Sequence, residues 1–216
     1  MHKLMTTITL GAESPRTRDH AEPDDDLNVL VRPAASAADY DALYRLRYRV
    51  YVEELGFTQV YADHGRRTVR DPLDATAITL IAEIDGAIIG TVRTNVAGDC
   101  DLGKYAVLHR LHELDGVSPE EISMTSKLIV AERYRNRRVM LRLAHTVFRI
   151  AVSRGVKVDF IDCERHLIPI YYRLGYRQTT EKPFEHPELG PRYPMRLFTD
   201  RSYLSRVRSP FVSSLP

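Results

Sequence analysis

The chain has 216 residues, of which 44% are hydrophobic and 28% are charged, and its formal net charge is +2. This length can bury one sizeable core, so the chain suits one domain with appendages, and disorder throughout is excluded. Nonspecific binding along nucleic acid is disfavoured because proteins with that function are strongly basic overall. The two cysteines, Cys100 and Cys163, indicate reduced cytosolic thiols, and neither a disulfide framework nor a metal site is expected.

The first 27 residues mix proline, charge and small residues without periodicity. We therefore expect residues 1–27 to form a flexible N-terminal lead. The apolar run within residues 1–10 is too short for a secretory signal, and no later segment reaches the roughly 18 apolar residues that span a bilayer. The sequence thus predicts no transmembrane segment and a cytoplasmic protein.

The body of the chain begins with a strand and a helix. Residues 28–32 predict a short strand, and Ser36 is a suitable helix cap. A helix is expected over residues 39–55, where Gly56 supplies a stop. Its apolar positions lie three or four residues apart and predict one buried face: Leu43, Leu46, Val50 and Tyr51.

A β-hairpin and an alternation of strands and helices follow. Asp85-Gly86 separates two β-rich runs, which is a strong hairpin signal. The later predicted elements are a strand over 122–130, a helix to about 154 that Gly155 ends, a strand over 156–162, a short helix over 167–174 and a final strand. This order predicts an α/β fold with one mixed central sheet.

The strand over 122–130 turns abruptly into an arginine-rich helix. A helix N-terminus offers free backbone N–H groups and the positive end of a dipole, and four arginines crowd this turn. Residues 133–157 carry only positive charges among their ionised side chains, without Asp or Glu. The pattern indicates a phosphate-bearing ligand from an acidic partner, and a solvated basic helix face is the alternative. The four arginines are Arg133, Arg135, Arg137 and Arg138.

This order of elements, followed by the run Tyr171 to Tyr176, resembles the GCN5-related N-acetyltransferase (GNAT) fold over residues 28–180. The resemblance implies a mixed central β-sheet flanked by helices on both faces. In that superfamily, glycines at the corner let the coenzyme A pyrophosphate approach the backbone. Here Arg138 and Met140 fill the small positions. This departure favours the single phosphate of an acyl-phosphopantetheine arm, carried by an acidic acyl carrier protein, over coenzyme A.

Four motifs in order narrow the resemblance. Residues 47–57, 71–74, 86–93 and 126–128 are similar to motifs of acyl-homoserine-lactone synthases and N-acyl amino acid synthases. Lactone synthases place Glu where this chain has Met124, and their early motifs carry Trp where this chain has Phe57. The N-acyl amino acid synthases are therefore favoured. Residues 181–216 resemble the C-terminal extension of these synthases, which we expect to pack on the domain.

The resemblance implies an N-acyltransferase that moves a long-chain fatty acyl group from an acyl carrier protein or acyl-CoA thioester to the amine of an amino acid or similar small molecule. No permanently bound cofactor and no metal are expected. Three alternatives stay open: a conventional acetyl-CoA-dependent N-acetyltransferase, an acyl-homoserine-lactone synthase, and a catalytically inactive GNAT-like binding module.

The resemblance also implies catalytic residues. Tyr171 would return a proton to the leaving thiolate, with Tyr172 as its structural competitor. Glu121 is a candidate general base, and Glu83, Glu164, His166 or a water relay are the other options. Four residues are expected to organise the site or to form a structural ion-pair network: Arg47, Asp71, Asp74 and Arg93.

Donor binding is expected along the strand and its corner. Backbone amides of Leu128 to Val130 would stabilise the oxyanion, and a β-bulge there would aim them. Strand alternation puts Lys127 on the face opposite Ser126 and Leu128. The full set of expected donor-binding residues is Ser126, Lys127, Leu128, Ile129, Val130, Arg135, Asn136, Arg137, Arg138, Val139 and Met140.

Overall fold

The computed structural model of the protein describes residues 28–135 and 137–215, and for Arg137 it describes the backbone alone. The predicted N-terminal lead, residues 1–27, lies outside this range, as does Asn136. Within the described residues, no helix combines the length and the apolar character needed to cross a membrane.

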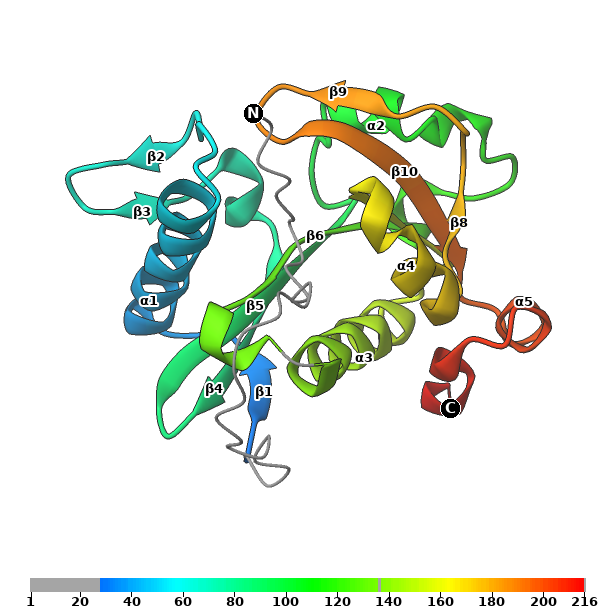
Figure 1. Ribbon diagram of the computed structural model, residues 1–216. Coiled ribbons are helices and arrows are strands. Elements are labelled where there is room, and N and C mark those ends of the chain that lie inside the picture. Colours follow the sequence, from blue (N-terminus) through cyan, green and yellow to red (C-terminus); the bar gives the residue numbers. More distant parts are fainter. Residues whose placement is uncertain (1–27, 136, 216) are drawn as a thin grey trace, which may run out of the picture.

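A mixed sheet of eight strands forms the centre of the molecule (Figure 1). The strand order is β1-β4-β5-β6-β7-β10-β8, with β9 paired to β10. Among the strand pairs of the described residues, only β6 and β7 are parallel. The strands are β1 (Leu30–Pro33), β4 (Ile78–Ile84), β5 (Ala87–Val96), β6 (Ile122–Val130), β7 (Val158–Cys163), β8 (Arg177–Gln178), β9 (Phe184–His186) and β10 (Gly190–Phe198), and a separate hairpin joins β2 (Ala62–Asp63) to β3 (Thr68–Val69).

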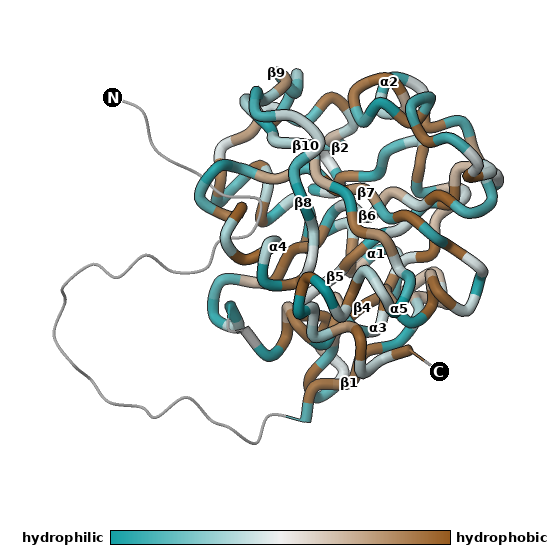
Figure 2. The backbone as a smooth tube through the Cα atoms, turned by 90° about the vertical axis from the view of Figure 1, so that its right-hand side faces the viewer, coloured by the Kyte–Doolittle hydropathy of each residue, from teal (hydrophilic) through white to brown (hydrophobic). Residues whose placement is uncertain are grey.

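Helices cover both faces of this sheet, as predicted (Figure 1). The helices are α1 (Ala37–Tyr48), α2 (Lys104–Leu108), α3 (Arg137–Ser153), α4 (Ile168–Leu174) and α5 (Arg201–Arg206). Alternate strand residues face opposite layers. Leu80 and Leu128 pack in the cluster that includes α3, whereas Ile81 and Ile129 pack on the α1 side. Figure 2 shows hydrophobic stretches gathered around β4, β5 and α3.

Helix α1 begins with the cap that the sequence predicts. The Asp39 N–H donates to Ser36 Oγ at 3.1 Å, and Asp39 Oδ2 accepts from the Ser36 N–H at 3.1 Å. After Tyr48 the helix continues as a wider π-helical turn over Arg49–Glu54, and Gly56, with φ +69°, follows its end. The predicted extent to residue 55 is thus confirmed, with a change of helix type that pattern reading did not detect.

The β4–β5 hairpin is also confirmed. Asp85 and Gly86 both have positive φ, +49° and +77°, as a two-residue type I′ turn requires. Strand β4 then pairs along its length with residues Ala87 to Thr94 of β5, with one irregularity near Ala82.

The segment after residue 180 supplies β10, which lies between β7 and β8 in the central sheet. The chain end is anchored because Phe211 stacks on Phe148 of α3 with ring centroids 4.5 Å apart. Gly175, with φ +107°, ends α4 so close to this end that an added Cβ would lie 2.8 Å from the Cβ of Ser209. The described part of the C-terminal extension, residues 181–215, therefore contributes to the sheet as well as packing on it.

Candidate active site

Strands β6 and β7 separate and leave a cavity between them. They pair only from Ile122 to Met124 on β6, opposite Val158 to Phe160 on β7. Beyond Met124, residues of β5, β6, β7, α3 and α4 line the opening, and most of their side chains are apolar. The apolar part of the wall includes Val92, Met124, Leu128, Ala144, Val147, Ile161, Leu167, Leu174 and Phe211.

A β-bulge in β6 lies beside this opening. Thr91 pairs with Ile129 and Arg93 with Ser126, so one intervening residue of β5 faces two residues of β6. Lys127, one of these two, has a φ of +53°. The predicted bulge is thus present, next to the segment 128–130. It interrupts the strand alternation. Lys127 Nζ lies over Tyr51 and Ser126 Oγ accepts from Arg93, so these two side chains share the α1 side, whereas Leu128 packs in the cluster with α3. The expectation that Lys127 faces away from Leu128 is thus confirmed, and the expectation that it faces away from Ser126 was wrong, although all three line the cavity.

Backbone groups of β6 point toward the opening. The Ala131 N–H donates to Ile89 O at 2.7 Å, on the β5 side. Because backbone direction alternates along an antiparallel strand, the N–H and C=O of Val130 turn to the opposite edge. Consistently, Val130 O accepts from Arg135 Nε at 3.0 Å, outside the ladder. The Val130 N–H therefore has the direction that an oxyanion donor in the cavity needs.

Arg47, Asp71, Asp74 and Arg93 form one buried ion-pair network. Arg47 Nη1 donates to both carboxylate oxygens of Asp74, at 2.8 and 2.9 Å. Arg93 Nη1 contacts Asp71 and Asp74, the latter at 3.1 Å, and Arg93 Nε donates to Ser126 Oγ at 3.1 Å. A capping box around the short 3₁₀ turn Pro72–Ala75 holds the two aspartates. The structural ion-pair network, which was one of the two roles expected for these four residues, is therefore present. It reaches the cavity wall through Arg93 and Ser126.

Lys127 joins this network as a third cation. Its Nζ lies 3.5 Å from Asp71 Oδ2 and 4.9 Å from the centroid of the Tyr51 ring. Three cations then face two carboxylates. Burial lowers the pKa of the Lys127 ammonium, and the neighbouring Arg93 and Arg47 act in the same direction, against the opposite effect of Asp71.

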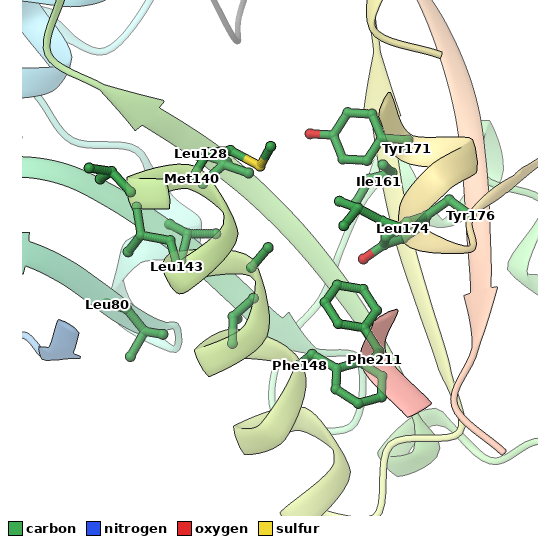
Figure 3. Packing of buried hydrophobic residues seen from close by; sticks show 14 of the residues in the cluster. Leu80, Leu128, Met140, Leu143, Phe148, Ile161, Tyr171, Leu174, Tyr176 and Phe211 are labelled. Atoms are coloured by element: carbon green, nitrogen blue, oxygen red, sulfur yellow. The ribbon is translucent and has the colours of Figure 1, made fainter. Parts of the chain in front are cut away.

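Tyr171 projects from α4 into the cavity region. Figure 3 shows its hydroxyl pointing from α4 toward Leu128 and Met140 across the gap. Burial raises its pKa well above 10, so the phenol stays protonated. Tyr172, by contrast, is 38% exposed, and its hydroxyl is directed to Gln178. The structure thus brings Tyr171, and not its neighbour, to the cavity.

A tyrosine and a histidine that the sequence analysis missed also line the cavity. His186 Nδ1 accepts from the Glu188 N–H at 3.1 Å, which leaves Nε2 to donate to the Tyr105 hydroxyl at 2.9 Å. The Tyr105 hydroxyl proton is then free to point elsewhere. Beside them, Arg192 Nε donates to Asp162 Oδ1 at 2.7 Å. No motif nominates these residues; His186 lies in the C-terminal extension, and Tyr105 lies on a helix that the sequence does not predict.

A second, more open pocket adjoins the cavity. Its polar wall has Asp71, Asp101, Lys104 and Glu188, and its apolar wall has Val60, Pro72, Leu73, Leu102 and Pro187 together with Tyr61. Lys127 and Tyr105 line both spaces. These two side chains therefore stand where the cavity and the pocket meet.

Glu121 does not belong to this site. It precedes β6 at the end remote from the bulge, where its carboxylate pairs with Lys157 and accepts from the Ser118 N–H. The expectation that Glu121 is the general base was wrong, because its carboxylate instead forms a surface ion pair and caps a 3₁₀ turn. Of the other options, Glu83 pairs with Arg32 at 2.9 Å, and Glu164 lies 3.5 Å from Arg192 and from His166.

The arginine corner divides into inward and outward side chains. Arg135 is largely buried, contacts Glu54 and donates to Val130 O, so its guanidinium is occupied by the fold. Arg133 and Arg138 are exposed. Val139 and Met140 are buried in the core beside Leu143, which makes their side chains packing residues. Asn136 and the Arg137 side chain lie outside the described part of the chain.

The comparisons with known proteins agree with this geometry. The family model of the N-acyl amino acid synthase FeeM matches residues 42–198. Among solved structures, FeeM, an N-acyl amino acid synthase from uncultured soil microbes, has a TM-score of 0.64 at 16% identity and covers 87% of this chain and 98% of that chain. No curated protein sequence gives a significant match.

Two further structures show the breadth of the likeness. The acyl-homoserine-lactone synthase LasI has a TM-score of 0.64 at 12% identity, covering 83% of this chain and 94% of that chain. A Lactobacillus plantarum protein, provisionally named an N-acetyltransferase, has a TM-score of 0.59 at 20% identity, covering 79% and 97%. At such identities the likeness concerns the fold, and it confirms the expected GNAT-like architecture.

Proposed function

Because the chain belongs to the FeeM family of N-acyl amino acid synthases and is an acyltransferase, we propose that it transfers a long-chain fatty acyl group to the amine of an amino acid or a similar small molecule. The donor in this proposal is the thioester of an acyl carrier protein or of coenzyme A. The observation that carries the proposal is the cavity between β6 and β7. Most of its lining is apolar and suits an acyl chain, and polar side chains such as Ser126, Lys127 and Tyr171 also line it, where they could contact a thioester.

The reaction requires a neutral nucleophile, stabilisation of the oxyanion and a proton for the leaving thiolate. The Val130 N–H, and beside the bulge that of Leu128, would donate to the oxyanion. Tyr171, kept protonated by burial, would give its proton to the thiolate. The amine attacks the thioester directly. A covalent acyl-cysteine is disfavoured because burial raises the pKa of the Cys163 thiol to about 12.

The corner supports an acyl carrier protein as the donor. Arg133, in the 3₁₀ turn before α3, and Arg138, in the first turn of α3, are exposed and can reach a phosphate or an acidic helix. The bulky Arg138 stands at a position where glycine would let a diphosphate approach the backbone. Coenzyme A stays a second candidate, and MesI, a structural neighbour, is a CoA-dependent acyl-homoserine-lactone synthase.

An amino acid is favoured as the acceptor over the precursor of a lactone. Met124, at the position where lactone synthases carry Glu, lies in the cavity wall and is 3% exposed. A thioether offers no carboxylate to accept a proton there. The open pocket beside Lys127 combines acidic, basic and apolar groups, which suits a small zwitterion.

A chain-length series tests the proposal. Release of free thiol is measured with acyl carrier protein and coenzyme A thioesters from acetyl to palmitoyl, in wild type and in Ala144→Phe. Ala144 lines the cavity from α3, so the larger ring should remove turnover of long donors more than of short ones. Thr146→Phe, on the same helix but outside the cavity lining, is the control. Turnover of acetyl-coenzyme A alone by the wild type would contradict the long-chain proposal.

A further inference from the structure

The backbone at Lys127 is unusual for a lysine. Of the non-glycine residues with positive φ in the described part of the chain, Lys127 is the one that lies within a strand of the central sheet, and the others are exposed at the surface. A left-handed conformation is strained for any residue with a Cβ, and Lys gains nothing there locally. Strained residues persist where the surroundings hold them, and they concentrate at functional sites.

The Lys127 side chain lies where the cavity between β6 and β7 meets the open pocket beside it. Lys127 and Tyr105 are the two described side chains that line both the cavity between β6 and β7 and the open pocket beside it. A thioester laid along β6 and an amine entering from the pocket would meet at this point. On the proposed function, the Lys127 side chain thus lines the place where the two substrates would meet.

Charged and titratable groups surround this amine from every neighbouring element. Asp71 lies 3.5 Å away, Arg93 comes from β5 and Arg47 from α1, and Tyr51 lies beneath the amine at 4.9 Å. From the other side come Glu188, Tyr105 and His186. Burial and the two arginines lower the pKa of Lys127, while Asp71 and Glu188 limit that effect. Asp71 is placed to stabilise the ammonium once the amine has taken a proton.

We propose that Lys127 is the general base of the acyl transfer and that Asp71 is its positioning partner. The inference rests on the proposed function and adds the base that the sequence does not identify. The acceptor nitrogen attacks the thioester carbonyl and forms the C–N bond, and neutral Lys127 Nζ takes one proton from that nitrogen. The C–S bond then breaks, and the thiolate takes the phenol proton of Tyr171. Transfer of one proton from the Lys127 ammonium to the Tyr171 phenolate, through solvent, restores both groups.

The test compares two acceptors in three proteins. Lys127→Met removes the amine at similar length, and Lys127→Asn keeps a residue that tolerates positive φ. An ordinary amino acid needs a base, whereas an aminooxy acid has a nitrogen that is unprotonated at neutral pH and that loses its proton readily after attack. We expect both variants to lose about 100-fold or more in kcat with the amino acid and much less with the aminooxy acid.

The pH profile gives a second readout. In wild type, kcat for the amino acid should fall as pH decreases through the Lys127 pKa, whereas kcat for the aminooxy acid should change little; this limb should be absent from both variants. Lys157→Met, which removes a surface lysine paired with Glu121, is the control and should behave as wild type. Equal losses with the two acceptors, or an unchanged acid limb, would overturn the proposal. A wild type inactive with every amine would instead contradict the proposed function.

Discussion

Arg47 Nη1 lies 2.8 Å from Asp74 Oδ1 and 2.9 Å from Oδ2, and the two side chains are 0% and 1% exposed. This pair fastens α1 to the turn that carries Asp71, and through Asp71 it supports Arg93 and Lys127. The Nε and Nη2 groups of Arg47 have no hydrogen-bond partner among the described residues, so Asp74 carries most of the compensation for burying this charge.

Loss of Asp74 should therefore destabilise the fold strongly. Asp74→Asn leaves the Arg47 charge buried without its counter-ion, and we expect the free energy of unfolding to fall by about 3–5 kcal/mol. Urea unfolding followed by circular dichroism measures it. Asp41→Asn, which removes the exposed partner of Arg45, is the matched control and should change little. An Asp74→Asn protein as stable as wild type would contradict the role of the pair.

Asp159 predicts an unusual pH dependence of stability. Burial raises its pKa from 3.8 to about 6, against hydrogen bonds from Ser123, Thr125 and Tyr176. A raised pKa means that the folded state favours the protonated carboxyl. Its stabilising contribution is thus complete below pH 4 and is lost as pH rises through 6, a change of about 3 kcal/mol.

Asp159→Asn isolates this effect, because the amide cannot ionise. The variant should match wild type near pH 4 and be the more stable of the two at pH 8, as judged by urea midpoints at both values. Other carboxyls, such as Asp71, have lowered pKa values and oppose the trend in both proteins, so the difference between the curves is the relevant quantity. A variant that is less stable than wild type at pH 8 would show that ionised Asp159 is well compensated.

The loss of kcat caused by removing the Tyr171 hydroxyl should increase with the basicity of the leaving thiolate. Tyr171→Phe removes the phenol proton, and we expect kcat for an alkyl thioester to fall by about 100-fold or more with KM little changed. A thiophenyl ester releases a weakly basic thiolate and should lose far less. Tyr172→Phe, whose hydroxyl lies at the surface, is the control. A similar loss with both esters would mean that Tyr171 serves packing alone.

The exposed arginines at the start of α3 should affect donor docking. Arg138→Glu should raise KM for an acyl carrier protein several-fold, most at low salt, because the attraction acts through charge. The same change at Arg149, also exposed but farther along α3, is the control. Arg135→Glu should lower stability instead, since Arg135 contacts Glu54 and Val130 O. An Arg138→Glu enzyme with unchanged KM at low salt would remove the docking idea.

Local signals predicted much of the fold. The Ser36 cap, the Asp85-Gly86 turn and the bounds of β6 follow from neighbouring residues, and the structure confirms them. The insertion of β10 between β7 and β8 could not be predicted in this way, because strand order depends on pairing between residues far apart in the chain.

The site was predictable only where a motif covered it. Arg47, Asp71, Asp74 and Arg93 came from ordered motifs and do lie together. The position of Lys127 on the same side as Ser126 could not follow from alternation, since a β-bulge interrupts the alternation there and no glycine marks the bulge in the sequence. Tyr105 sits on a helix of five residues, too short for a periodic signal.

The most direct test of the central claim is identification of the acylated product by mass spectrometry. Wild type would be incubated with long-chain acyl carrier protein, the matching acyl-CoA, acetyl-CoA, a pool of amino acids and S-adenosylmethionine. The account predicts a long-chain N-acyl amino acid with its carboxylate free, formed together with an equal amount of released thiol. Acetylated amines alone, or an N-acyl homoserine lactone as the sole acylated product, would contradict it.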